Sequence, residues 1–162
     1  MARDGSRGAS GVGQSLVRVG VGAYWLYFAS QKWPAPYGAP PHGIGWLLPL
    51  MEAAAKTNPV PGLQTVFSRL VVPNWQFLAI AQTVTETVVG VLLILGIATR
   101  PAALVGTLVA IELSLTVAFL QTDVGLRWLY YLPIPATLAV FVGGAGSLGV
   151  GRLLSRPRWL AA

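Results

Sequence analysis

A continuous apolar run over residues 75–97 constrains the fold of this chain more than any other feature. Crossing the hydrocarbon core of a membrane takes about 20 residues of helix, and this run has that length. Only 10% of the 162 residues are charged, whereas a soluble domain carries about 25%. Because so few charges do not cover a globule of this size, we expect the chain to lie in lipid.

Three further segments resemble this run in length and apolar character. The four predicted spans lie at about residues 13–32, 75–98, 101–120 and 127–146. Their apolar residues are continuous and do not alternate with polar ones, which favours helices over the strands of a membrane barrel. The sequence therefore predicts an all-α fold, an integral membrane four-helix bundle that forms a single domain over residues 1–162.

The first connection, about residues 33–74, is long, whereas the later connections are short turns. It contains two apolar stretches, GIGWLLPLMEAAAKT and GLQTVFSRLVV, that are too short to cross a membrane. Its tryptophan and tyrosine side chains suit the headgroup zone. We therefore expect short interfacial helices in a long first loop outside the cytoplasm.

Basic residues outnumber acidic ones, 11 to 5, and they flank the apolar runs. We attribute this excess to topology and to anionic lipid headgroups, and expect no nucleic-acid partner. The basic residues fall on two sides: Arg3, Arg7, Arg18, Arg100, Arg152, Arg156 and Arg158 with the termini, and Lys32, Lys56, Arg69 and Arg127 opposite. The positive-inside rule then places both termini in the cytoplasm of a bacterial or archaeal cell.

Cysteine is absent, and His42 is the only histidine. This composition excludes a disulfide, a Cys/His zinc site and a haem held by two histidines of this chain. We expect no metal site and no covalently bound cofactor. Any redox role must use a diffusible or borrowed cofactor, for which quinone is the candidate.

Three ionisable residues, Arg18, Glu86 and Glu112, lie within the predicted spans. Each costs about 2.5–3.5 kcal/mol on insertion scales, and such residues usually face the bundle interior or a wet cavity. With a rise of about 1.5 Å per residue, the two carboxyl groups lie at one level, and Tyr24 lies at a similar height. We therefore expect Glu86 to point inward.

Two interpretations of this polar group remain open. Glu86, with Gln82 one turn earlier, is either a buried acid or hydrogen-bond donor beside a quinone or proton path, or a polar contact that joins helices. Arg18 either pairs with Glu86 or extends to the headgroups. The hypothetical cavity set is Glu86, Arg18, Gln82, Tyr24 and Glu112, with Lys32 and Arg100 as rim residues that anchor the spans or flank an entrance.

Two stretches resemble the signatures of the DoxX/DoxD family. LVRVGVGAYWLYFASQKW is similar to its opening signature, and ETVVGVLLILGIATRPAALVG is similar to its second signature. The long first loop is closer to the DoxD-like branch, the small subunit of thiosulfate:quinone oxidoreductase. The resemblance implies a four-helix membrane protein that works with another subunit. The matching positions are Arg18, Gly22, Lys32, Glu86, Gly90, Gly96 and Arg100.

The function expected from this resemblance is an inner-membrane subunit of a quinone-linked electron-transfer assembly. If the chain is part of an enzyme, that enzyme is a quinone-linked oxidoreductase with a further subunit, and the sequence indicates no catalytic residue. The alternative is a purely structural accessory subunit that packs against larger membrane partners and binds lipid. A small transporter or proton path is disfavoured because the chain has no visible internal repeat.

Overall fold

The computed structural model describes residues 3–33 and 43–150, and this part of the chain is helical without a strand. His42, Arg152, Arg156 and Arg158 of the sequence interpretation lie outside these residues. The elements are α1 (Arg3–Ser30), η1 (Ile44–Trp46), α2 (Leu47–Thr57), α3 (Leu63–Val66), η2 (Phe67–Val71), α4 (Trp75–Leu95), α5 (Thr99–Thr116), η3 (Ala118–Leu120), α6 (Val124–Tyr131) and α7 (Pro133–Gly143).

Within the described residues, three helical segments are long and apolar enough to cross a membrane: Trp75–Leu95, Thr99–Leu120 and Val124–Gly143. They correspond to the three later predicted spans in position, length and apolar composition. The third is interrupted at Leu132, where α6 ends and Pro133 starts α7, because proline has no N–H to continue a helix. α1 has 28 residues but is not among the three apolar segments, and its crossing stays a prediction.

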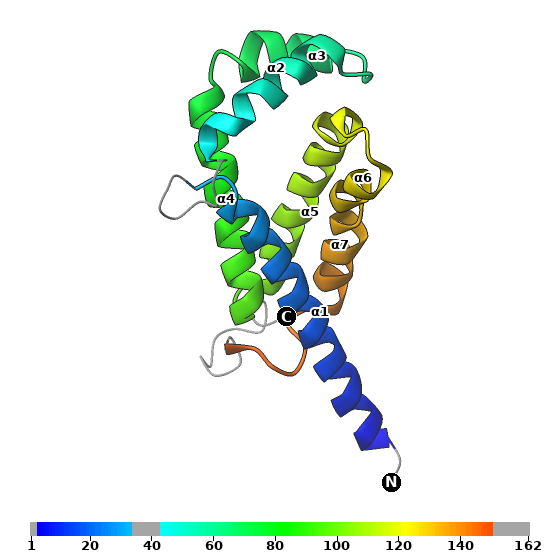
Figure 1. Ribbon diagram of the computed structural model, residues 1–162. Helices are drawn as coiled ribbons and strands as arrows, with labels where there is room; N and C mark the ends of the chain where they lie inside the picture. The colour runs from blue at the N-terminus through cyan, green and yellow to red at the C-terminus, as the bar shows by residue number, and fades with distance from the viewer. Residues whose placement is uncertain (1–2, 34–42, 151–162) are drawn as a thin grey trace.

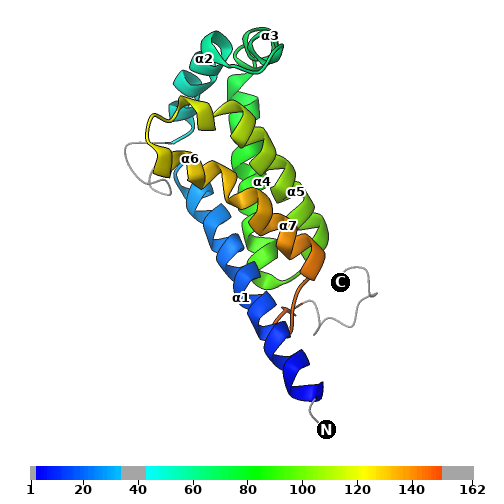
Figure 2. The ribbon, with the colours of Figure 1, turned by 90° about the vertical axis from the view of Figure 1, so that its right-hand side faces the viewer.

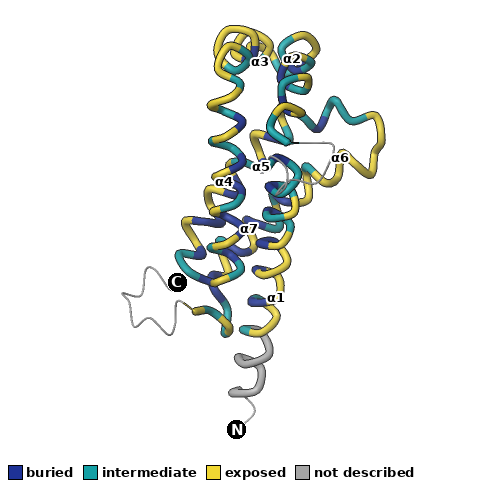
Figure 3. Tube along the Cα trace, turned by 60° about the vertical axis from the view of Figure 1, so that its left-hand side comes forward, coloured by how far each residue is buried: buried dark blue, intermediate teal, exposed yellow. Residues whose placement is uncertain are grey.

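The long helices lie side by side (Figures 1 and 2), with α1 against α4 and α7, and α5 against α4 and α7. A core cluster joins them around Trp25, whose side chain is 0% exposed. Many large apolar residues are exposed instead, among them Phe77, which is 72% exposed. Figure 3 shows exposed residues along each of the long helices. In water so much apolar surface is unusual, whereas lipid solvates it.

α1 and α4 approach closely at Gly22 and Gly90. A Cβ at Gly90 would lie 2.7 Å from Leu26 Cγ and 2.9 Å from the carbonyl oxygen of Gly22. A Cβ at Gly22 would lie 2.9 Å from the carbonyl oxygen of Gly90. Glycines permit this backbone contact, which is a common way for membrane helices to pack.

The connection after α1 forms helices in the two places where the sequence predicts them. η1 with α2, and α3 with η2, lie beyond the end of α1 and cover one end of α4 (Figure 1). A second apolar cluster holds them there: Leu47, Met51, Ala54, Phe67 and Ala79. The helices are therefore packed on the protein, and their position at a membrane interface stays a prediction.

We expect Gly90→Ala to destabilise the protein, because the new methyl group meets the backbone of α1. Overpacking of this kind costs about 1–3 kcal/mol. Gly20→Ala is the matched control, since a Cβ there has no atom within 4 Å and alanine favours a helix by about 1 kcal/mol. Thermal unfolding in detergent should show a lower midpoint for Gly90→Ala alone. Equal midpoints for the two variants would contradict the close approach.

Candidate functional site

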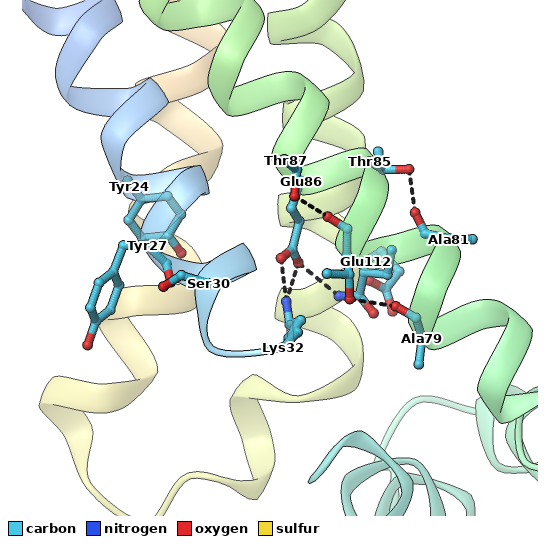
Figure 4. Close-up of polar contacts among 12 residues, drawn as sticks. Tyr24, Tyr27, Ser30, Lys32, Ala79, Ala81, Thr85, Glu86, Thr87 and Glu112 are labelled. Carbon is cyan, nitrogen blue, oxygen red and sulfur yellow. Dashed lines mark hydrogen bonds and ion pairs between the residues drawn. The ribbon is translucent and has the colours of Figure 1, made fainter. Parts of the chain in front are cut away.

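A buried ion pair joins α4 to the residues that follow α1. The Nζ of Lys32 donates to both carboxyl oxygens of Glu86 (Figure 4). The side chains are 4% and 0% exposed. Gln82, one turn before Glu86, donates its amide to Oε1 at 3.2 Å. Glu86 therefore points inward, as the sequence predicts, and its charge is balanced inside the protein.

Of the two alternatives that the sequence left open for Arg18, the pairing with Glu86 is contradicted by the structure. α1 and α4 run in opposite directions through the Gly22–Gly90 contact, and this register places Arg18 at the C-terminal end of α4. The same register brings the chain after α1 to the middle of α4, where Lys32 meets Glu86. Lys32 is accordingly a buried residue and not the rim residue that we expected from its place at the end of a span.

Arg18 caps carbonyl groups instead. The residue is 1% exposed, and its guanidinium donates to the carbonyls of Ala145 at 3.0 Å, Ile94 at 2.8 Å, Leu93 and Leu148. The last carbonyls of α4 have no partner within the helix, and they form the negative end of its dipole. Arg18 therefore joins the end of α4 to the segment after α7, and does not extend to the headgroups.

Gly96 makes room for this cap. It ends α4 with a φ of 70°, in the left-handed region that favours glycine. A Cβ at this position would lie 2.9 Å from Nη1 of Arg18. The glycine is needed for both the turn and the approach of the guanidinium.

A cavity of about 570 Å³ lies between the short helices and the adjoining halves of α4 and α5. Its wall is mostly apolar, with four polar side chains: Gln82, Thr85, Glu112 and Thr116. The carboxyl group of Glu112 accepts a hydrogen bond from the hydroxyl of Thr116 at 3.0 Å. Gln82 lies on this wall and also bonds Glu86, so it links the cavity to the ion pair.

A smaller hollow of about 80 Å³ lies beside Lys32. It shares Leu47, Leu50, Leu113 and Val117 with the wall of the larger cavity. Lys32 therefore borders the smaller hollow, and Glu86 contacts Gln82 on the wall of the larger cavity.

Not all of the predicted cavity residues meet in this place. Gln82 and Glu112 line the large cavity, whereas Glu86 lies behind Gln82. Tyr24 donates its hydroxyl to the carbonyl of Leu129 at 2.7 Å and lines a separate hollow between α1 and the helices after α5. Arg100 is exposed at the start of α5, and its role as a rim residue stays a prediction.

Sequence reasoning missed the residues of α2 and η2 that cover the cavity, including Leu50, Met51 and Leu70. Their apolar pattern predicts a helix at the surface. The sequence contains no pattern that predicts a cavity between this helix and the spans. No group of three or more His, Cys, Asp or Glu side chains able to hold a metal ion occurs within residues 3–33 and 43–150.

A protein-family model described as DoxX matches residues 13–121, which is most of the chain. No curated protein matches the chain, and no solved structure matches it. The match confirms the broader part of the resemblance that the two signatures indicate. The narrower assignment, to the DoxD-like subunit of thiosulfate:quinone oxidoreductase, stays a prediction.

Removing one member of the Lys32–Glu86 pair should destabilise the protein more than removing both. Lys32→Met or Glu86→Leu leaves one buried charge without its partner, which costs about 3–5 kcal/mol. The double variant leaves no charge, so we expect it to recover most of that loss. A double-mutant cycle on unfolding midpoints in mixed micelles measures the coupling. Additive losses would contradict the ion pair.

Arg18→Met should loosen the segment after α7, because four carbonyls lose the hydrogen bond that Arg18 donates, two of them in that segment. Hydrogen bonds to a charged group contribute about 1.5–3 kcal/mol each. We expect faster hydrogen exchange and faster proteolysis at residues 144–150. The control is Arg100→Met, which removes an exposed arginine. Unchanged protection in Arg18→Met would show that the cap does not hold this segment.

Proposed function

We propose that this chain, which belongs to the DoxX family, is a small membrane subunit of a quinone-linked electron-transfer assembly. In this proposal α1 is a fourth span beside the three apolar segments. Both termini lie in the cytoplasm of a bacterial or archaeal cell, and the short helices lie outside. The excess of arginine around the termini supports this orientation.

The cavity is the observation that carries the proposal. Its volume of about 570 Å³ lies in the usual range for small-molecule sites, about 300–1,000 Å³. A ligand in it meets a long apolar wall and a few polar groups at one side, including Gln82 and Glu112. A quinone has the same division, with an apolar tail and a head ring that carries two oxygens.

The ion pair gives this site a route for charge compensation. Gln82 lines the cavity and donates to Glu86, and Lys32 donates to both oxygens of the same carboxyl group. When the head of a bound ligand gains or loses charge, the amide of Gln82 can shift its hydrogen bond to Glu86. The Lys32–Glu86 pair can then adjust to the new charge. We assign no catalytic residue to the chain, and propose that a partner subunit delivers the electrons.

A purely structural accessory role is the second candidate, and the satisfied polar groups favour it. The guanidinium of Arg18 donates its hydrogen bonds to carbonyls at the end of α4 and after α7. The Lys32–Glu86 pair joins the residues after α1 to α4. Contacts of this kind hold a bundle together without any ligand. In this role the cavity would contain membrane lipid, and the outer apolar faces would pack against larger subunits.

Filling the cavity distinguishes the two candidates. Ala81 lines the cavity, so Ala81→Trp should exclude a quinone ring. We expect quinone that copurifies with the native assembly, and its quinone reductase rate, to fall at least tenfold. Leu104→Trp is the control, because Leu104 is 46% exposed on α5 and is not part of the cavity wall. Unchanged quinone content and rate, with lipid in the cavity of the parent protein, would favour the structural role.

A further inference from the structure

We propose that the cavity opens sideways into the hydrocarbon layer of the membrane, between the covering helices α3 and η2 and the middle of α5. Its ligand is a membrane-borne molecule whose long hydrocarbon chain enters through this opening. For a quinone, this route rests on the proposed function. The route itself does not, because the acyl chain of a phospholipid can take it as well.

The burial of the wall residues locates one edge of the opening on the covering helices. Leu47 and Met51 are buried, so the wall is closed on the side of α2. Phe67 of η2 is also buried, whereas Leu70, three residues later on the same helix, is 59% exposed. The wall is therefore closed at Phe67 and open at Leu70.

α5 forms the second edge of the opening. Leu108 is 59% exposed, and Glu112, one turn later, is exposed as well. Leu113 and Thr116 on the same helix are buried. Among the described residues of the wall, the exposed ones are Val66, Leu70, Leu108 and Glu112.

The edge on α5 lies at the depth of the hydrocarbon core. Leu108 and Glu112 are near the middle of the apolar segment Thr99–Leu120, which has 22 residues. With a rise of about 1.5 Å per residue, Leu108 lies about 14 Å from the start of this segment, and the hydrocarbon core is about 30 Å thick. At this depth the opening faces lipid chains.

The surface beside the opening is apolar too. Leu104, Ile111 and Leu115 are exposed on α5. Together with Leu108 they are spaced by three or four residues, which places them on one face of the helix. This face continues into the mostly apolar wall of the cavity. A hydrocarbon chain can therefore pass from the bilayer into the cavity without exposing apolar surface to water.

Polar side chains follow the same route. Glu112 lies at the opening, where its carboxyl group accepts a hydrogen bond from Thr116 at 3.0 Å, and Gln82 and Thr85 are half-buried on the wall that α4 contributes. A small polar head on the chain therefore finds partners along the wall. A polar molecule without a chain has to leave water and cross lipid to reach this opening, which is unfavourable because it loses its hydrogen bonds with water.

A fluorine reporter inside the cavity tests the route. The chain has two methionines, and Met51 lines the cavity and is buried. Biosynthetic trifluoromethionine therefore places a fluorine label in the wall, and Met51→Leu identifies its NMR signal by removing it. The full chain is studied in nanodiscs. The probes are a phospholipid with a nitroxide on its acyl chain, a long-tailed ubiquinone in the bilayer, and a ubiquinone analogue without a tail in the buffer.

We expect the nitroxide chain to broaden the Met51 signal. The long-tailed quinone should reverse this broadening at an amount per nanodisc about tenfold lower than the analogue without a tail, which corresponds to about 1.4 kcal/mol.

Leu108→Trp makes the test specific to the opening, because the larger ring narrows it at the edge on α5. We expect less broadening by the nitroxide chain, and an amount of long-tailed quinone that is about tenfold higher for the same effect. Leu104→Trp is the matched control, since Leu104 lies on the same exposed face of α5 and is not part of the cavity wall. The control should behave like the parent protein.

The outcomes separate the inference from the proposed function. If the nitroxide chain broadens the Met51 signal and neither quinone reverses it, the quinone-linked function fails and the lateral route stands. If the analogue without a tail shifts the Met51 signal at equal amounts in the parent and in Leu108→Trp, the quinone site stands and the lateral route is overturned. An unbroadened Met51 signal, or equal broadening in the parent and in Leu108→Trp, overturns the lateral route as well.

Discussion

The contact between the backbones of α1 and α4 at Gly22 and Gly90 determines where the buried side chains of Arg18 and Lys32 lie. Two helices that touch without side chains between them have one register, because any slip brings a Cβ into a carbonyl. That register sets Arg18 against the end of α4 and Lys32 against Glu86. The two interactions are therefore consequences of one packing contact.

Both buried cations are neutralised inside the protein, but in different ways. Lys32 has a carboxylate partner, whereas Arg18 is held by carbonyl groups at the negative end of a helix dipole. Arg18 lies at the other end of α4 from the cavity. Lys32 is neutralised by Glu86, and the polar side chains of the cavity wall are Gln82, Thr85, Glu112 and Thr116. The ion pair and the proposed ligand site are thus connected, since Gln82 both contacts Glu86 and lines the cavity.

The short helices add the second element of the site. α2 and η2 do not cross a membrane, but their apolar faces cover the half of α4 that extends beyond α1. A bundle of helices of equal length would close this space with side chains. The cavity therefore exists because α1 ends near the level of Glu86, while α4 and α5 continue toward the covering helices.

Local composition determined the later spans, the inward direction of Glu86 and the family, because hydropathy and short motifs depend only on neighbouring residues. Composition also pointed to helices in the long connection. The sequence offered Arg18 as one possible partner of Glu86 and did not identify Lys32, since both lie on the same segment and only the register of α1 against α4 selects between them. Tyr24 was placed near Glu86 by height alone, which ignores the direction that it faces. Only the tertiary structure determines the cavity, because its wall is formed by side chains from α2, α3, η2, α4 and α5, which are separated in the sequence.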